Sequence, residues 1–137
     1  MRLEVYYFAY GSNLSRRQML ERCPDALPRG TATLPNHRLI FAGWSRKWGG
    51  GVASIRPHRG DKVLGAIYEI SDRCLRILDR YEDCPGTYER LNVTVFTDLG
   101  DPFAAVTYIL AKQSEESRPS RDYLATIQEG YRDWELA

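Results

Sequence analysis

The hydrophobic pattern at the start of the chain changes abruptly after a short run. Residues 3–9 are rich in aromatic and β-branched side chains, which predicts a strand. Residues 10–13, Tyr-Gly-Ser-Asn, interrupt it, because glycine, serine and asparagine favour turns. Residues 14–23 predict a short helix that ends at Pro24, with three candidate N-caps in Ser12, Asn13 and Ser15.

Strand-like patterns dominate the middle of the chain. Four segments predict strands: 30–34, 38–43, 52–56 and 63–70. A loop at 44–50, rich in glycine at its end, separates the second of these strands from the third. A Pro-His-Arg-Gly-Asp turn at 57–61 separates the third from the fourth. Ser71 and Asp72 cap a helix that runs to about Tyr81. Near the end of the chain, residues 88–97 and 104–110 predict strands. Residues 122–134 predict a helix, which follows a polar loop that contains Pro119.

The order of these elements predicts the fold class. Too many strands follow one another directly for a doubly wound parallel sheet. An α+β fold with a mixed, barrel-like sheet and flanking helices fits better. The 137 residues suit one domain over residues 1–137.

Composition narrows the possible partners. Hydrophobic residues make up 43% and charged residues 27%, which is typical of a globular protein. The net charge of +1 gives no electrostatic reason to expect nucleic acid or a membrane surface, and no apolar run approaches the roughly 20 residues that span a bilayer. The first residues lack the pattern of a signal peptide.

Three cysteines, Cys23, Cys74 and Cys84, are an odd number without Cys-x-x-Cys spacing. This argues against a disulfide framework and a structural zinc site, and favours a reducing cytoplasm. His37 and His58 lie in turn-like segments without ligand-spaced partners, so both are expected at the surface. No metal or cofactor is expected.

Residues 10–13 are the first candidate site. A turn between a strand and a helix directs backbone N–H groups and the positive end of the helix dipole at one place, which suits a carboxylate or another anion. A plain capping turn is the alternative, and spacing alone favours it. The chain has no Gly-x-Gly-x-x-Gly, phosphate-loop or Gly-x-Ser-x-Gly motif.

Glu82 is the second candidate. Leu75, Leu78 and Glu82 share one helix face, so the carboxylate continues an apolar stripe. Partial burial would raise its pKa and prepare it as a base. A solvated glutamate beside Asp79 and Asp83 is the alternative, which base rates favour. Tyr108 has an inward position on its strand, where its phenol needs a partner from the core or from a ligand.

Three segments together resemble one known family. They are residues 7–14 (Tyr-Phe-Ala-Tyr-Gly-Ser-Asn-Leu), residues 50–55 with 60–65, and residues 78–82 followed by Tyr88. In order and spacing they resemble the γ-glutamylcyclotransferase family, the AIG2-like group, over nearly the whole chain. The resemblance implies a compact mixed β-barrel with flanking helices.

The resemblance also implies a reaction and a site. Cyclotransferases of this kind release 5-oxoproline and an amine from a small γ-glutamyl substrate, with no metal or cofactor. It implies that Glu82 is the general base. It implies a substrate-binding set of ten residues: Tyr7, Phe8, Ala9, Tyr10, Gly11, Ser12, Asn13, Tyr88, Tyr108 and Tyr123.

Two departures concern the leaving amine. Many members of the family have glycine where this chain has Asp83, and residues 83–87 with the short C-terminus shape the leaving-group side. A non-catalytic binding module and a small structural domain remain as alternatives. The discriminating observation is whether Tyr10, Glu82 and Tyr108 converge in one cavity.

Overall fold

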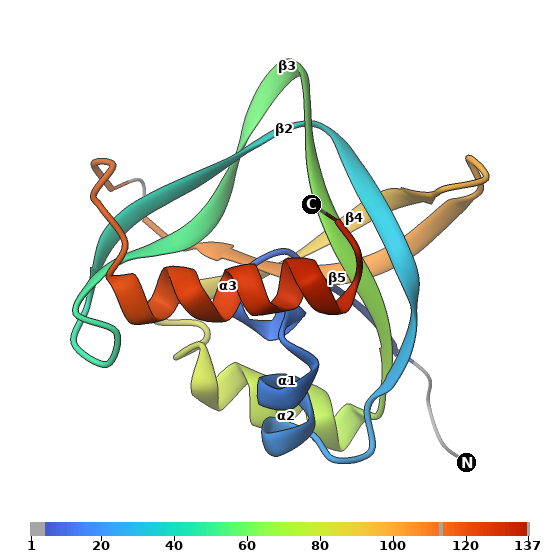
Figure 1. The fold of residues 1–137 in the computed structure, drawn as a ribbon, viewed down its shortest axis with the longest axis horizontal. Helices are drawn as coiled ribbons and strands as arrows, with labels where there is room; N and C mark the ends of the chain where they lie inside the picture. Colours follow the sequence, from blue (N-terminus) through green and yellow to red (C-terminus); the bar gives the residue numbers. More distant parts are fainter. Residues whose placement is uncertain (1–4, 113, 137) are drawn as a thin grey trace.

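A computed structural model describes residues 5–112 and 114–136 (Figure 1). Five strands form a closed barrel in the order β1-β3-β2-β4-β5. The first, β1 (Val5–Ala9), pairs antiparallel with β3 and parallel with β5, where Tyr7 lies opposite Val106. This single parallel pairing closes the barrel. The mixed, barrel-like sheet predicted from the sequence is confirmed, and residues 3 and 4 of the predicted first strand lie outside the described residues.

The two longest strands merge segments that the sequence separates. β2 (Leu27–Ser45) contains both predicted strands of that region, and β3 (Gly50–Ile70) contains the next two. The turn predicted at 57–61 does not end β3. Residues 58–61 instead bulge out of the ladder, between the pairs His37–Pro57 and Pro35–Lys62. The predicted turn corresponds to this bulge, and the two strands predicted on either side of it are parts of one strand because β2 pairs with both.

The second hairpin completes the wall. β4 (Tyr88–Thr97) pairs antiparallel with β5 (Pro102–Leu110), and the end of β4 joins β2 through the pair Ala32–Thr97. The predicted bounds of β4 are confirmed, and β5 begins two residues earlier than predicted. β5 therefore delivers Thr107 and Tyr108 beside β1.

Serine side chains begin all three α-helices. Ser15, Ser71 and Ser120 accept hydrogen bonds from backbone N–H groups three residues further on, and so cap α1 (Arg16–Arg22), α2 (Asp72–Tyr81) and α3 (Arg121–Asp133). The predicted first helix is divided, because Ser15 has an extended backbone (φ −60°, ψ 113°). A 3₁₀ turn, η1 (Ser12–Leu14), precedes it.

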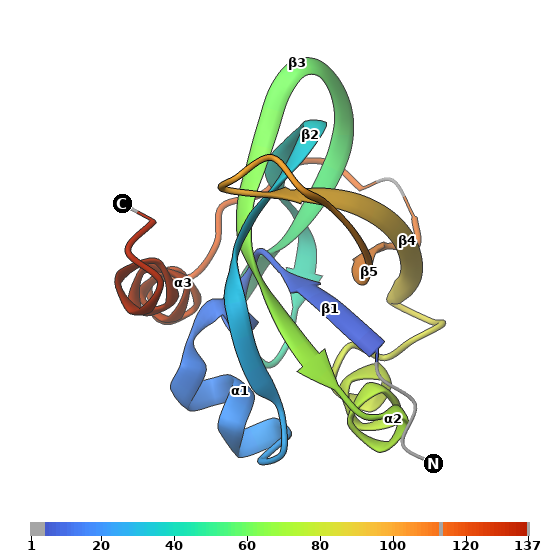
Figure 2. The ribbon, with the colours of Figure 1, turned by 90° about the vertical axis from the view of Figure 1, so that its right-hand side faces the viewer.

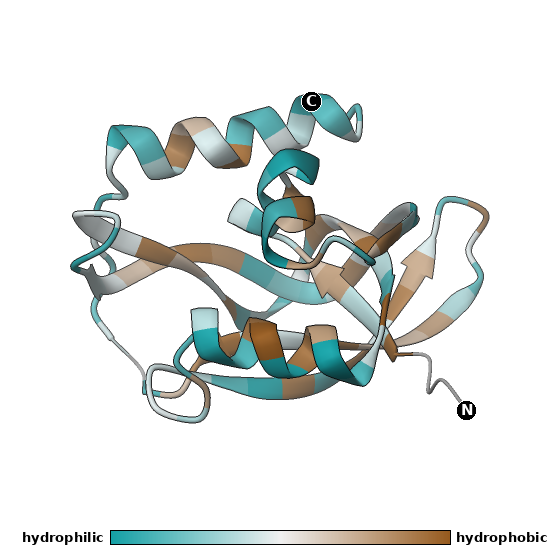
Figure 3. Cartoon of the chain, turned by 90° about the horizontal axis from the view of Figure 1, so that it is seen from below, coloured by the Kyte–Doolittle hydropathy of each residue, from teal (hydrophilic) through white to brown (hydrophobic). Residues whose placement is uncertain are grey.

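The helices cover two sides of the barrel. α1 and α2 both lie at one end, where they contact each other, and α3 runs along the outside (Figures 1 and 2). Hydrophobic and hydrophilic residues alternate along α2 and α3 (Figure 3), as expected of helices with one buried face. Among the described residues, no helix combines the length and apolar character needed to cross a membrane.

α3 approaches the turn after β1 very closely at Gly130. A β-carbon at this position would lie 2.6 Å from the backbone nitrogen of Ser15. The indole Nε1 of Trp134 donates to the carbonyl of Leu14 at 2.9 Å and fastens the same junction. The position of η1 therefore depends on the packing of a helix more than 100 residues further along the chain.

The expectation of no disulfide was wrong. Cys23, at the end of α1, is bonded to Cys74 in α2, with their Cα atoms 5.5 Å apart, and Cys84 is free. Three cysteines are compatible with one disulfide and one free thiol. The bonded pair was not evident from the sequence because Cys23 and Cys74 are 51 residues apart. Cytoplasmic location stays a prediction, and the cysteines no longer support it.

Gly130→Ala should lower the free energy of unfolding by about 1–3 kcal/mol, because the added methyl group has to displace backbone at the α3–η1 contact. Gln128→Ala, at an exposed position of the same helix, is the control and should change stability little. Urea unfolding followed by circular dichroism measures both. Equal stability of the two variants would contradict the tight contact.

Thiol alkylation tests the disulfide. Without reductant, the denatured protein should take up label at Cys84 alone, and after reduction at all three cysteines. The chain-entropy model assigns about 4 kcal/mol of stabilisation to a crosslink spanning 51 residues, so reduction should also lower the melting temperature. Three labelled thiols without reductant would exclude the bond.

Candidate active site

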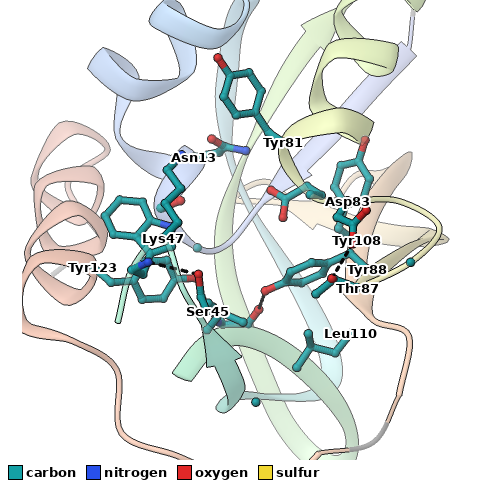
Figure 4. Close-up of a pocket in the computed structure, with 18 of the residues that line it drawn as sticks. Asn13, Ser45, Lys47, Tyr81, Asp83, Thr87, Tyr88, Tyr108, Leu110 and Tyr123 are labelled. Carbon is teal, nitrogen blue, oxygen red and sulfur yellow. Dashed lines mark hydrogen bonds between the residues drawn. The ribbon is translucent and has the colours of Figure 1, made fainter. Parts of the chain in front are cut away.

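A cavity of about 540 Å³ lies where β1 ends, β3 begins and β5 ends. The loop between β2 and β3 and the segment after α2 complete its walls. It brings together most of the residues selected from the sequence (Figure 4). The predicted members that line it are Tyr7, Tyr10, Gly11, Ser12, Asn13, Glu82, Tyr88, Tyr108 and Tyr123.

Phe8 and Ala9 lie elsewhere. Both are buried in the barrel core and neither lines the cavity. Phe8 packs over Gly65 of β3, where a β-carbon would lie 2.6 Å from the phenyl ring. Alternation along β1 explains the burial of Phe8, because neighbouring side chains in a strand point to opposite faces and Tyr7 faces the cavity.

The turn after β1 is held from both sides. The Tyr10 hydroxyl donates to the backbone carbonyl of Tyr108, and the Ser12 hydroxyl accepts from Gln18 Nε2 at 2.7 Å. Gly11 allows close approach to β3, since a β-carbon there would lie 3.3 Å from that of Ala53. Within the described structure, the amide N–H groups of Gly11, Ser12 and Asn13 have no acceptor, as is usual at the start of a helical turn.

Glu82 follows the last turn of α2 and faces the cavity. Its side chain is 19% exposed, and its Oε1 lies 4.0 Å from Nη1 of Arg22. Burial raises the pKa of this carboxyl, and the positive charges of Arg22 and Lys47 oppose that rise without cancelling it. The partial burial and raised pKa predicted from the helix face are confirmed.

Tyr88 and Tyr123 hold one residue of β3 between them. The Tyr88 hydroxyl donates to the carbonyl of Ala53 at 2.8 Å, and the Tyr123 hydroxyl accepts from its N–H at 2.9 Å. Burial is the largest cause that raises the pKa of each phenol, so both stay protonated near neutral pH. These tyrosines give the cavity a polar, uncharged wall.

Tyr108 has a protein partner. Its hydroxyl donates to Oδ1 of Asp79 at 2.7 Å, and Arg90 Nε donates to the same oxygen at 3.0 Å. Burial raises the pKa of Asp79, but the hydrogen bonds from Arg90 and Tyr108 together lower it below its ordinary value. The phenol is therefore fastened to α2 by a carboxylate, a partner that the sequence did not indicate.

Asp83 occupies a strained backbone position. Its φ is 50°, in the left-handed region that glycine adopts most easily and aspartate tolerates. This accounts for the glycine expected here from the resemblance. The Asp83 carboxylate accepts from the Thr87 hydroxyl at 2.8 Å, which closes the turn that forms one wall of the cavity.

Arg22 and Lys47 were missed by the sequence reasoning. Arg22 lies in the last turn of α1, where a basic residue is common because it interacts favourably with the helix dipole. Lys47 lies in the loop between β2 and β3, and its ammonium is 5.4 Å from the ring of Tyr81. Neither position carries a local signal for a site. Among the described residues, no three metal-binding side chains cluster.

Two cyclotransferases are among the known proteins that this chain resembles. A γ-glutamylcyclotransferase of Bos taurus is 33% identical over 126 residues, covering 88% of this chain and 66% of the bovine protein. A γ-glutamylaminecyclotransferase of Bos taurus is 46% identical over 61 residues, covering 44% of this chain and 36% of that protein. This chain thus spans about two thirds of the length of the first relative.

Structure and family comparisons extend the match. A solved structure of a γ-glutamyl cyclotransferase superposes with a TM-score of 0.93 at 30% identity, covering 98% of this chain and 82% of that chain. The family model described as gamma-glutamyl cyclotransferase, AIG2-like, matches residues 7–134. The chain therefore belongs to the AIG2-like γ-glutamylcyclotransferase family.

Proposed function

We propose that this chain is a cyclotransferase that converts a γ-glutamyl amide or dipeptide into 5-oxoproline and a free amine. The observation that carries the proposal is the meeting of Tyr10, Glu82 and Tyr108 in one cavity with the Gly11–Asn13 turn. A purely structural domain has no need of such convergence. The two bovine relatives, a γ-glutamylcyclotransferase and a γ-glutamylaminecyclotransferase, support the same class of reaction.

The reaction needs little from the protein except shape and proton transfer. The α-amine of the substrate attacks its own γ-carbonyl, which forms the lactam C–N bond and breaks the γ-amide C–N bond. The substrate's α-ammonium gives up two protons, and the departing nitrogen leaves as an ammonium. Because the nucleophile is tethered, holding a reactive conformer contributes on the order of 7–11 kcal/mol to lowering the barrier.

Glu82 is the proposed proton carrier. Its buried carboxylate accepts a proton from the α-ammonium and passes it to the leaving nitrogen. A raised pKa suits both tasks, since it makes the carboxylate a stronger proton acceptor and keeps more of it protonated near neutral pH, ready to donate. Arg22 and Lys47 keep enough positive charge nearby for the ionised form to persist.

The Gly11–Asn13 turn is proposed to hold the glutamyl end. Its three amide N–H groups lack acceptors among the described residues and lie at the cavity wall. Oxygens of a bound glutamyl group supply the acceptors that these N–H groups lack. Asp83, Gly86 and Thr87 and the loop between β2 and β3 also line the cavity, and we assign them to the leaving amine.

Glu82→Gln should reduce release of 5-oxoproline by at least about 10²-fold, because the amide cannot accept the proton. The assay follows 5-oxoproline by chromatography over a panel of γ-glutamyl dipeptides and γ-glutamylamines. Glu89→Gln, an exposed glutamate outside the cavity, is the control and should keep full activity. Full activity of Glu82→Gln would remove Glu82 as the base. Ligand binding by the wild type without any release would instead favour the non-catalytic binding module.

The same variant should show a characteristic dependence of stability on pH. Because folding raises the Glu82 pKa above its ordinary 4.5, the folded chain binds more protons than the unfolded chain between these two values. The stabilising contribution is complete at low pH and is lost as pH rises through the folded pKa. Glu82→Gln should therefore melt higher than wild type at about pH 8, and the difference should vanish near about pH 4. If wild type and Glu82→Gln have the same melting temperature as each other at both pH values, that result would contradict the burial of the Glu82 charge.

A further inference from the structure

Arg22 makes contacts that set the direction of a chain of hydrogen bonds. Its side chain is only 8% exposed, and it lines the cavity. Nη1 donates to Oδ1 of Asn13 at 3.1 Å, and the guanidinium lies 4.4 Å from the centre of the Tyr81 ring. An arginine side chain can only donate hydrogen bonds. Whatever atom of Asn13 faces Arg22 must therefore be the oxygen.

The orientation of the Asn13 amide follows from this. Gln18 Nε2 donates to the same Oδ1 at 3.1 Å, so two donors hold the oxygen on the α1 side. The amide nitrogen is left on the other side, where it donates to the hydroxyl oxygen of Tyr7 at 3.0 Å. The direction of the chain is thus from Arg22 through Asn13 to Tyr7.

Tyr7 is left with an unused donor. Its oxygen accepts from Asn13, so the hydroxyl hydrogen has to point away from that amide, and no described residue accepts it. The ring is 5% exposed and lines the cavity. Leaving a buried donor unpaired costs about 1–3 kcal/mol, a cost that a ligand acceptor removes.

We propose that Tyr7 is a further catalytic residue, whose hydroxyl donates a hydrogen bond to the γ-carbonyl oxygen of the substrate, and that Arg22 is a positioning residue that directs it through Asn13. This inference rests on the proposed cyclotransferase function. We assign the γ-carbonyl as the acceptor because Tyr7 and Glu82, the proposed proton carrier, line the same cavity. Burial, followed by the neighbouring Glu82 charge, raises the Tyr7 pKa, so the phenol stays protonated beside the base. A donor at this place stabilises the oxyanion that forms as the amine attacks.

A double-mutant cycle tests the direction of the chain. Tyr7→Phe should lower kcat on the order of 10²-fold with KM within a few-fold, because the bond strengthens in the transition state. Asn13→Asp keeps the shape but presents oxygen to Tyr7, so the hydroxyl turns back to the carboxylate and a similar loss follows. Adding Asn13→Asp to Tyr7→Phe should then cost little more. Tyr6→Phe, a neighbouring phenol outside the cavity, is the control.

Arginine variants separate positioning from packing. Arg22→Lys still only donates and should keep kcat within about 10-fold, whereas Arg22→Gln can present either end of its amide and should lose more. If the losses of kcat in Tyr7→Phe and Asn13→Asp multiply in the double variant, the two residues act independently. That result would overturn the hydrogen-bond relay from Arg22 through Asn13 to Tyr7. A raised KM with unchanged kcat in Tyr7→Phe would overturn the assignment to the γ-carbonyl.

A measurement without substrate tests the hydrogen-bond relay independently of the proposed function. In ¹⁵N-labelled free protein, Tyr7→Phe should shift the side-chain amide resonances of Asn13, and Tyr6→Phe should leave them in place. Unmoved resonances in Tyr7→Phe would exclude the Asn13–Tyr7 bond. If the wild type releases no 5-oxoproline from any substrate while these resonances shift, the proposed function fails together with the catalytic role of Tyr7, and the hydrogen-bond relay stands.

Discussion

The site depends on the parallel pairing of β1 with β5, which closes the barrel at Tyr7 and Val106. The Thr107 hydroxyl donates to the carbonyl of Phe8 at 2.7 Å and reinforces the same junction. The junction places the end of β1 beside the end of β5 and the start of β3, although these segments are far apart in sequence. Because of this closure, the turn after β1, the carboxylate after α2 and the tyrosines of β4 and α3 share one cavity.

The chemistry of the cavity is dominated by one buried carboxylate among neutral phenols. Tyr7, Tyr10, Tyr88 and Tyr123 all have raised pKa values, with burial as the largest cause, and so they remain protonated donors. Phenols supply polarity without further charge, which keeps desolvation as the leading influence on Glu82. Such surroundings suit an internal cyclisation, which needs a base and a folded substrate but no water.

The sequence indicated those parts of the structure that local pattern determines. The α2 cap, the face that carries Glu82 and the bounds of β4 follow from periodicity and turn chemistry. The joined strands of β2 and β3 did not, because pairing across the hairpin overrides the local turn signal at 57–61. Phe8 was included with its neighbours in the motif, yet strand alternation turns it into the core. Arg22 and the Cys23–Cys74 bond depend on how α1 meets α2, which local sequence does not encode.

The hydrogen bonds that Tyr88 and Tyr123 make to Ala53 also bear on aggregation. The first part of β3 borders the cavity and is paired with β2 on one side, so its other side is an open strand edge. Tyr88 and Tyr123 occupy both the carbonyl and the N–H of Ala53, and the Ser54 hydroxyl accepts from the N–H of Leu110. Open strand edges recruit strands from other molecules and promote aggregation. These side chains, together with the Arg118 carbonyl that accepts from the N–H of Gly51, occupy that edge without a sixth strand, so the barrel keeps an opening for a small molecule while denying it to another chain.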